Sequence, residues 1–465
     1  MYLRNRSRIQ RWMWRCVLSN ELTTMSRIKL KKGFDLKLKG GLTSTDIDGL
    51  AALSADYAVV PDDFTGVIPR LDRKSGEAVK AGEPLYHDKN HEQVKVVSPV
   101  SGTVKEVRRG ERRKIEAIII APDDQHDNRQ KLDLKRPALD VLLESGLWVM
   151  LRQRPYDVVP DPCVRPRDIF VTAFDSAPLA PSLRTVLSER EQYLSKGVEV
   201  LATLTDGKVH VGCRIDEELN IAGAEMHTFD GPHPAGNAGV QAANICPVNK
   251  GEVVWTLDVV TLARIGELFT TGMVSHDTVV AITGECISKP RMVRATMGCR
   301  MSSLLGEEAL NGCRIISGNV LTGVRVNADG WLRAPYRHVT VIPEVNQPDE
   351  FMGWASLSPK RFSLYRDFTS WLTGNRKPVS LDARVKGGER AIVRLDEYDR
   401  MLPMDIYAEF LIKAIIAFDI DKMEQLGIYE VAPEDFALAE FACTSKLELQ
   451  RIVREGLDRM RAEMS

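Results

Sequence analysis

The sequence predicts an α/β multidomain protein, and three observations lead to that prediction. At 465 residues the chain is long enough for several hydrophobic cores. Short runs of Val, Ile and Leu between spaced glycines predict an all-β domain at 25–125. Strand-like runs that alternate with helical stretches predict a Rossmann-like α/β domain at 126–270. Two further domains are predicted after these. They are a small β-grasp module at 271–343 and a C-terminal segment at 344–465 that ends in a helical bundle.

The all-β domain has glycines at turn spacing: Gly76, Gly82, Gly102 and Gly110. The pattern resembles the barrel-sandwich of lipoyl and biotinyl carriers, which show G-x-x-V-x-x-G and S-P-x-x-G-x-V. In those carriers a lysine at a hairpin tip takes the cofactor, and the corresponding tip here is "HDKNHEQ", with Lys89. Because this tip is longer and Lys89 lacks the usual apolar neighbours, modification of Lys89 is a minor hypothesis.

Two histidines share the same tip. His87 and His91 are four residues apart, with Asp88 and Glu92 beside them. On a helix this spacing would favour a metal site, but on a β-turn the two rings need not converge. We therefore expect a solvated tip and no metal site in the chain.

Alternating elements predict the Rossmann-like domain. Strands are expected at "DIFVTAF", "VEVLATL", "HVGCRI", "AEMHTF" and "EVVWTLD". Helices are expected at "SLRTVLSEREQYLSKG", capped by Ser182 and stopped by Gly197, and at "VVTLARIGELFTTG". In "FDGPHPAGNAGVQAAN" (229–244) a strand, a Gly/Pro turn and a helix follow one another. This arrangement often holds a phosphate or a flavin, so the loop is the first candidate site.

The last two segments have different patterns. "DTVVAITGECISKPRMVRATMGCRMSSLLG" and "CRIISGNVLTGVRV" show short strands, a Gly turn and a brief helix, which suit a β-grasp module. Helical spacing follows at 404–427, 433–443 and 445–464. Gly427 is expected to end the first of these helices, Pro433 to open the second and Ser445 to cap the third.

Composition excludes several classes of protein. The net charge is −1 and 44% of residues are hydrophobic, which is ordinary for a soluble globular protein and gives no sign of nucleic-acid binding. No stretch reaches the ~18–20 apolar residues of a membrane helix. The eight cysteines include no CxxC, so the common iron–sulfur and zinc motifs are missing. We expect free thiols in a reducing compartment.

Residues 1–24 form a basic extension without the apolar core of a signal peptide. One interpretation is a misassigned start codon, with the natural start at Met25. The other is a basic, Trp-bearing arm that touches anionic lipid. The sequence leaves both interpretations open.

Several irregular phrases point to one family. They include "RQRPYDVVPDP", "RPRDIFVTAFDSAPLAP", "GPHPAGNAG", "RIISGNVLTG", "FMGWASLSPKRFS" and "YDRMLPMDI". With these phrases in order from Met25 to near its C-terminus, the chain resembles the A subunit of the Na⁺-translocating NADH:quinone oxidoreductase. Its domain order is similar to that of the NADH-binding flavoprotein subunit of complex I and the equivalent Rnf subunit, which bind FMN.

The resemblance implies that the flavin-binding loops are degenerate here. The relatives lay a glycine-rich run on the FMN phosphate, whereas the matching "GLWVMLRQRPYDVVPDP" places side chains such as Arg152 and Arg154 there. Asp175 survives from an acidic loop, Ala238 replaces a Glu, and the iron–sulfur motif is reduced to Cys443. This subunit is therefore expected to bind no redox cofactor, with the flavins and the iron–sulfur centre on other subunits.

Two interpretations of the role of the loop at 229–244 remain open. It is either a rigid turn that locks a helix to the sheet or a site that receives a quinone headgroup. A quinone needs apolar walls and one or two hydrogen-bond donors. His233, Asn237 and the amides of the helix N-terminus could supply donors, and Gly236 lies between them. We favour the rigid turn and assign no catalytic residue.

The resemblance implies a peripheral subunit on the cytoplasmic face of the bacterial inner membrane. It implies membrane subunits as partners, and a complex that reduces a ubiquinone-type quinone to quinol, coupled to Na⁺ export. The subunit is expected to assist the quinone-reducing step. Two alternatives are a self-sufficient FMN/NADH diaphorase like the complex I flavoprotein, and a carrier modified on Lys89.

Overall fold

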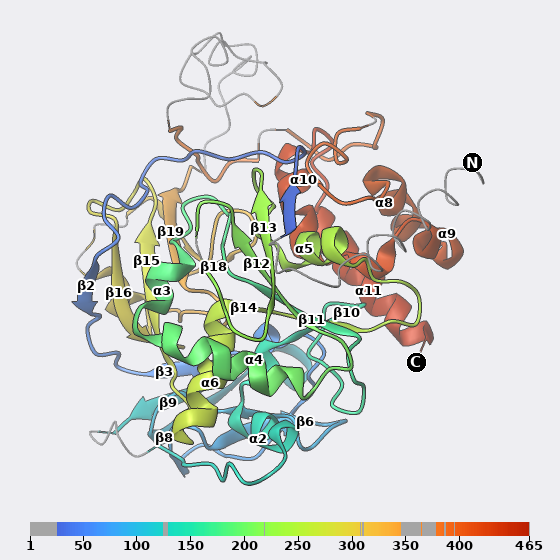
Figure 1. The fold of residues 1–465 in the computed structure, drawn as a ribbon. Helices are drawn as coiled ribbons and strands as arrows, with labels where there is room; N and C mark the ends of the chain where they lie inside the picture. Colours follow the sequence, from blue (N-terminus) through green and yellow to red (C-terminus); the bar gives the residue numbers. More distant parts are fainter. Residues whose placement is uncertain are drawn as a thin grey trace.

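The computed structural model describes residues 26–464 except 124–128, 218, 307, 309–310, 346–363, 365–377, 386 and 395. The basic extension and the phrase "FMGWASLSPKRFS" lie outside the described residues. Within the described part of the chain, no helix is both long enough and apolar enough to cross a membrane. Figure 1 shows the barrel-sandwich below a central α/β sheet, with the β-grasp sheet on one side and the C-terminal helices on the other.

The α/β domain is built on a six-stranded sheet in the order β1-β13-β12-β11-β14-β10. The strands are β1 (Ser26–Lys29), β10 (Arg152–Arg154), β11 (Asp168–Thr172), β12 (Val209–Arg214), β13 (Glu225–Asp230) and β14 (Val254–Asp258). Strands β11 to β14 are parallel, and their order 13-12-11-14 is that of a doubly wound fold, as predicted. The N-terminal strand β1 pairs in parallel with β13, and β10 pairs antiparallel with β14.

The helices of this domain are α3 (Leu183–Leu187), α4 (Leu194–Ala202), α5 (Ala238–Ile245) and α6 (Val259–Thr271). The expected stop at Gly197 is wrong, because Gly197 lies inside α4. A Cβ there would overlap the Leu262 carbonyl of α6, so glycine allows the two helices to approach closely. The strand expected at "VEVLATL" is also wrong, since most of this stretch continues α4 and buries Val198 and Leu201.

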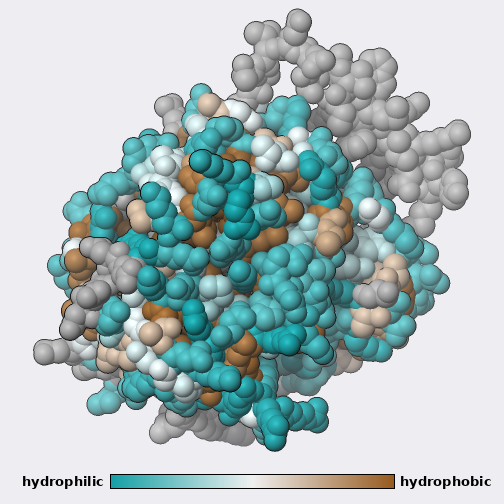
Figure 2. Space-filling model, turned by 90° about the horizontal axis from the view of Figure 1, so that it is seen from below, coloured by the Kyte–Doolittle hydropathy of each residue, from teal (hydrophilic) through white to brown (hydrophobic). Residues whose placement is uncertain are grey.

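The barrel-sandwich consists of two small antiparallel sheets, β3-β9-β8-β5 and β4-β6-β7, as predicted. The strands are β3 (Tyr57–Val59), β4 (Pro69–Leu71), β5 (Ala78–Val79), β6 (Pro84–Asp88), β7 (Lys95–Val97), β8 (Gly102–Arg109) and β9 (Ile115–Pro122). Val104, Ile118 and Ile120 are fully buried in its core. Helix α2 (Ala138–Ser145) packs on β7. From below, the surface of the molecule is mostly hydrophilic, with apolar side chains in separate patches (Figure 2).

The β-grasp module has the sheet order β18-β17-β19-β15-β16-β2. Its elements are β2 (Ile47–Leu50), β15 (Asp277–Thr283), β16 (Arg291–Thr296), α7 (Met301–Leu305), β17 (Cys313–Ser317), β18 (Val324–Val326) and β19 (His338–Pro343). Cys286 and Cys313 form a disulfide, so the expectation of free thiols is wrong for these two. The fold brings the loop after β15 to the start of β17, and the two Cα atoms lie 6.5 Å apart.

The C-terminal helices are α8 (Ala408–Ala417), α9 (Ile420–Gln425), α10 (Ala437–Ala442) and α11 (Leu449–Met464). The single helix expected over 404–427 is divided, because Phe418 has a left-handed conformation between α8 and α9. Pro433 opens a 3₁₀ turn before α10, as expected. Ser445 does not cap α11; its hydroxyl donates to the Ala391 carbonyl instead.

Candidate functional site

The loops after β11 and β13 and the direct junction of β14 with α6 lie at the carboxyl ends of the parallel strands. The strand order reverses between β11 and β14, and doubly wound folds bind ligands at this point. We call these loops and their contacts the switch-point site. It contains most of the residues that the sequence analysis singled out.

His233 in the loop after β13 is enclosed by the N-terminal segment. The residue is only 4% exposed. Its N–H donates to Asp35 Oδ1 (2.9 Å) and its carbonyl accepts the Phe34 N–H (2.8 Å). Nδ1 lies 3.0 Å from Ser176 Oγ, while Nε2 has no partner among the described residues. Burial lowers the pKa of His233 to about 4, so the ring is neutral at neutral pH.

Gly236 is held directly against the end of β11. Its N–H donates to Ser176 Oγ (2.8 Å) and its carbonyl accepts the Thr172 hydroxyl (2.8 Å). The φ of Gly236 is not in the left-handed region, so the backbone conformation does not itself require glycine. A Cβ would instead meet Ser176 N at 2.6 Å and the Phe174 carbonyl oxygen at 2.9 Å. Close approach, not φ, therefore requires glycine.

The N-terminus of α5 is covered by other parts of the chain. Asn237 is the N-cap residue, and its Nδ2 donates to the Glu434 carbonyl (3.3 Å). Ala238 opens the helix, and a Cβ on the next residue, Gly239, would overlap the Arg154 guanidinium. The place where a helix N-terminus would receive an anion is thus filled by a protein side chain.

Arg154 joins β10 to the C-terminal helices. It is 1% exposed and donates to Asp435 Oδ2 (2.8 Å) and the Glu430 carbonyl (2.7 Å). It also pairs with Glu434 at 3.3 Å. Asp435, likewise buried, accepts the Ala432 N–H (2.9 Å). The carboxylate of Asp435 consequently supplies the negative charge near the N-terminus of α5.

Carboxylates surround the switch point between β11 and β14. Asp258 caps α6 by accepting the Thr261 N–H (2.8 Å) and receives two hydrogen bonds from Arg337 (2.8 and 3.1 Å). Burial opposes its ionisation, but the charge and hydrogen bonds of Arg337 hold the pKa of Asp258 below its ordinary value. Asp175 follows β11, accepts the Ala177 N–H (2.8 Å) and lies within electrostatic range of Arg337 and Asp258.

Arg152 lies apart from this site. Its Nη2 donates to the Asp63 carbonyl (2.7 Å) and thereby ties β10 to the barrel-sandwich. Trp148 nearby in sequence is fully buried, donates to the Pro160 carbonyl (2.9 Å) and packs edge-on against Trp255. Trp148, in the stretch that we expect to correspond to a flavin loop, is therefore part of the hydrophobic core.

Sequence reasoning missed three residues of the switch-point site. Asp258 could have been found, because it ends a predicted strand at this edge of the sheet. Arg337 comes from the β-grasp module and Asp435 from the C-terminal helices, and no local pattern connects either to β11 or α5.

The hairpin tip between β6 and β7 presents its side chains separately. Lys89 is exposed at the tip, and its N–H donates to the Ile68 carbonyl (2.8 Å). His87 Nδ1 lies 2.7 Å from Asp72 Oδ1, while His91 Nε2 lies 3.8 Å from Asp161 Oδ1. The two rings take different partners, which agrees with the expectation that they need not converge.

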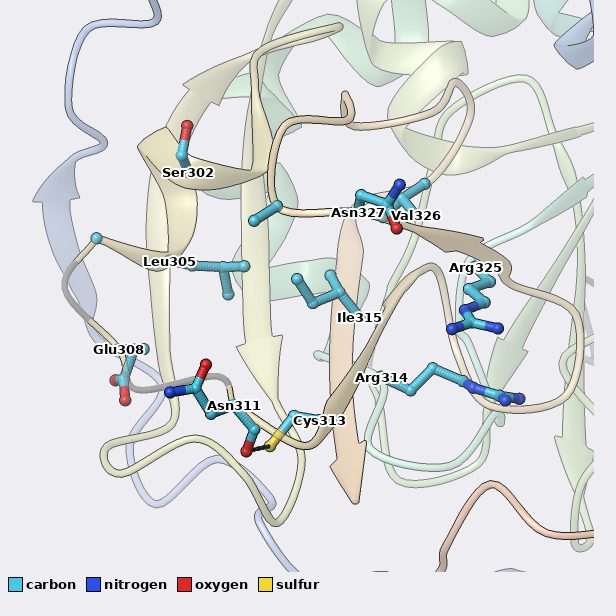
Figure 3. A pocket seen from close by; sticks show the side chains of 12 residues that line it. Ser302, Leu305, Glu308, Asn311, Cys313, Arg314, Ile315, Arg325, Val326 and Asn327 are labelled. Atoms are coloured by element: carbon cyan, nitrogen blue, oxygen red, sulfur yellow. Dashed lines mark hydrogen bonds between the residues drawn. The ribbon is translucent and has the colours of Figure 1, made fainter. Parts of the chain in front are cut away.

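A cavity of about 430 Å³ lies in the β-grasp module (Figure 3). Arg314 of β17 and Arg325 of β18 lie side by side on its wall. Arg314 makes two 2.7 Å bonds to Glu344, and Arg325 approaches the same carboxylate at 3.5 Å. None of the site residues predicted from the sequence lines this cavity.

The fold and the site together define a class of protein: a Rossmann-like domain, flanked by a barrel-sandwich and a β-grasp module, whose helix N-terminus is filled by an internal ion pair. Family models described as the NqrA N-terminal barrel-sandwich hybrid domain, the NqrA second alpha/beta domain and the NQRA C-terminal domain match residues 28–123, 135–274 and 279–328. The chain belongs to the NqrA family, the A subunits of the Na⁺-translocating NADH-quinone reductase.

Curated relatives match nearly the whole chain. The A subunit of the Na⁺-translocating NADH-quinone reductase of Vibrio anguillarum is 34% identical over 450 residues, covering 94% of this chain and 100% of that protein. A relative of the same name from Neisseria meningitidis serogroup C is 33% identical over 454 residues, with the same coverage. Among solved structures, an NAD⁺-reducing [NiFe]-hydrogenase matches with a TM-score of 0.32 and 14% identity, covering 46% of this chain and 48% of that chain.

Proposed function

We propose that the chain is the peripheral A subunit of a complex that oxidises NADH, reduces a ubiquinone-type quinone to quinol and couples this reaction to Na⁺ export. The observation that carries the proposal is the match to relatives of that name along 94% of the chain and all of each relative. In this proposal the chain is held at the cytoplasmic face of the bacterial inner membrane by contacts with the membrane subunits of the complex.

The subunit in our proposal carries no redox cofactor itself. Two features support this. Arg154 and Asp435 fill the N-terminus of α5, where a flavin phosphate would need free amides. Asp258, whose pKa Arg337 holds below its ordinary value, lies at the switch point, and a phosphate there would meet its negative charge. The flavins and the iron–sulfur centre then belong to other subunits of the complex.

We further propose that the chain assists the quinone-reducing step by shaping the site and not by chemistry at His233. The imidazole is neutral and enclosed, so it is poorly suited to exchange a proton with a bound quinone. Asn237 already donates to the Glu434 carbonyl. Both residues are accordingly better explained as parts of the rigid turn.

Purification of an affinity-tagged chain from bacterial membranes in mild detergent tests the assignment to the complex. We expect membrane subunits to copurify, together with NADH:quinone reductase activity that Na⁺ stimulates. Recovery of the chain alone under conditions that preserve the rest of the complex would contradict the proposal.

Spectroscopy of the isolated chain tests the statement on cofactors. We expect a colourless protein without iron, unable to oxidise NADH with an artificial electron acceptor. A yellow protein with near-stoichiometric FMN and such activity would establish the diaphorase alternative. An added mass on Lys89 would establish the carrier alternative.

A further inference from the structure

Three metal-binding side chains converge between the barrel-sandwich and the α/β domain. His91 comes from the hairpin tip between β6 and β7, and Asp161 and Cys163 come from the connection between β10 and β11. One ligand atom from each residue lies within 4.8 Å of the other two, and His91 Nε2 is 3.8 Å from Asp161 Oδ1. Neither the family comparisons nor the sequence pattern points to this cluster.

The backbone around the cluster is fixed by neighbouring side chains. The His91 N–H donates to Asp88 Oδ2 (3.1 Å), and the other oxygen of Asp88 accepts the Ile68 N–H (2.7 Å). On the opposite side, the Asp161 N–H donates to Gln153 Oε1 (3.1 Å). The hairpin and the connection are thus positioned before any ion binds, which reduces the ordering that binding requires.

The donor set has the chemistry of a zinc site. Imidazole, carboxylate and thiolate are the three kinds of ligand that Zn²⁺ takes from proteins, and tetrahedral bond lengths place such atoms about 3.4–3.6 Å apart. The 3.8 Å separation of His91 and Asp161 is close to this value, and the exposed Cys163 side chain is able to rotate toward them. The ionised Asp161 and Cys163 would neutralise a divalent cation.

We propose that His91, Asp161 and Cys163 bind one Zn²⁺ ion, which links the hairpin of the barrel-sandwich to the α/β domain. Binding forms three bonds from Nε2 or Nδ1, a carboxylate oxygen and Sγ, and the thiol proton of Cys163 passes to solvent. Water fills the fourth position. His91 and Asp161 also line a cavity of about 210 Å³, which gives that water room.

Cobalt titration of the metal-stripped, full-length chain tests the proposal. We expect one Co²⁺ per chain, with a sulfur-to-cobalt charge-transfer band and the visible bands of tetrahedral cobalt, and displacement of Co²⁺ by Zn²⁺. Cys163→Ser should abolish the charge-transfer band. His91→Ala and Asp161→Asn should each weaken Zn²⁺ binding by more than the roughly 10–100-fold that loss of an outer hydrogen-bond partner costs a metal site.

Two variants serve as matched controls. His87→Gln changes the other histidine of the hairpin, and Cys246→Ser changes a thiol outside the cluster; both should bind Co²⁺ like the parent chain. Zn²⁺ should raise the melting temperature of the parent and of these controls, but not of Cys163→Ser. The melting temperatures of all variants without metal show whether each still folds.

Other outcomes overturn the proposal. The absence of stoichiometric binding to a folded parent chain does so directly. A cobalt spectrum that persists in Cys163→Ser and His91→Ala shows an adventitious ion only, bound elsewhere on the surface. Binding that is lost equally in His87→Gln or Cys246→Ser places the ion at other residues.

Discussion

Gly236 has no space for a side chain, because the neighbouring Ser176 amide and Phe174 carbonyl belong to the backbone and cannot rotate away. We expect Gly236→Val to lower the free energy of unfolding by about 1–3 kcal/mol, the usual cost of overpacking a filled site. Chemical denaturation of the isolated chain measures this loss.

Gly388→Val is the matched control for that substitution. A Cβ at Gly388 meets nothing within 4 Å, and its φ is not positive. We expect a change within about 0.5 kcal/mol, as is usual for surface substitutions. Equal effects of the two substitutions would show that crowding is not the reason for glycine at position 236.

His233→Ala separates the two interpretations of the loop after β13. The imidazole is 4% exposed, so we expect the apparent quinone affinity of the assembled complex to stay unchanged. A lost hydrogen bond to quinone would instead weaken that affinity roughly two- to twelvefold, equivalent to about 0.5–1.5 kcal/mol. Quinone-dependent kinetics measure the affinity.

Two controls accompany the His233→Ala variant. NADH oxidation with an artificial acceptor checks the electron-entry reaction, and the melting temperature checks the fold. A weaker quinone affinity in a complex of unchanged stability would show that His233 contacts the quinone.

At the scale of secondary-structure elements, the pair of Arg154 and Asp435 fastens β10 and α5 to the helical domain. Both residues are at most 1% exposed. Removal of one partner leaves a buried charge, so Arg154→Met should cost about 3–5 kcal/mol of unfolding free energy. The exposed pair Arg451–Glu455 is the control, and Arg451→Met should cost less than about 1 kcal/mol.

A double-mutant cycle identifies the source of that loss. Arg154→Met and Asp435→Asn should be strongly non-additive, with a coupling of about 1–3 kcal/mol, because the residues are in direct contact. Additive effects would mean that the pair does not stabilise the interface, and that the single substitutions act through packing alone.

Strand β1 makes the first described residues part of the α/β sheet. It begins at Ser26, so a chain started at Met25 should melt like the full-length chain and assemble equally well. A chain started at Lys31 loses β1 and its pairing with β13, and should melt at a lower temperature. Loss of membrane association on removal of residues 1–24 would support a lipid-binding arm.

Local sequence patterns predict which segments form strands and helices better than they predict which segments contact one another in the fold. The buried strands β11 and β14 and the helix α6 were found from periodicity, because each buries a continuous apolar face. The strand predicted at "VEVLATL" is wrong because Val198 and Val200 lie in α4, where packing at Gly197 overrides strand propensity. The partners of Arg154 come from residues 430–435, and nothing near β10 in the sequence indicates them.

At the scale of the whole molecule, four buried or half-buried histidines are neutral at neutral pH. Burial lowers the pKa of His227, His233 and His338 to about 4 and that of His276 to about 3. Because these values lie below the unfolded value near 6.5, the unfolded chain binds more protons at mildly acid pH. The part of the unfolding free energy that depends on these neutral histidines is complete above pH ~6.5. It is lost as the pH falls toward ~4.

His276→Gln measures one part of this effect. At pH values between about 6 and 4, each such histidine adds about 1.4 kcal/mol per pH unit to the slope of unfolding free energy against pH. The variant should lose roughly that slope relative to the parent, while the contribution of the carboxylates cancels in the comparison. Equal slopes for parent and variant would show that folding does not lower the pKa of His276.

The position of β1 has a consequence for synthesis on the ribosome. Ser26–Lys29 is made early, but its partner His227–Asp230 follows about two hundred residues later. At roughly 5–20 residues per second the first strand waits about 10–40 s with its backbone unpaired. The sheet edge therefore closes only when about half of the 465 residues have been made, and until then the backbone of β1 needs protection from wrong pairing.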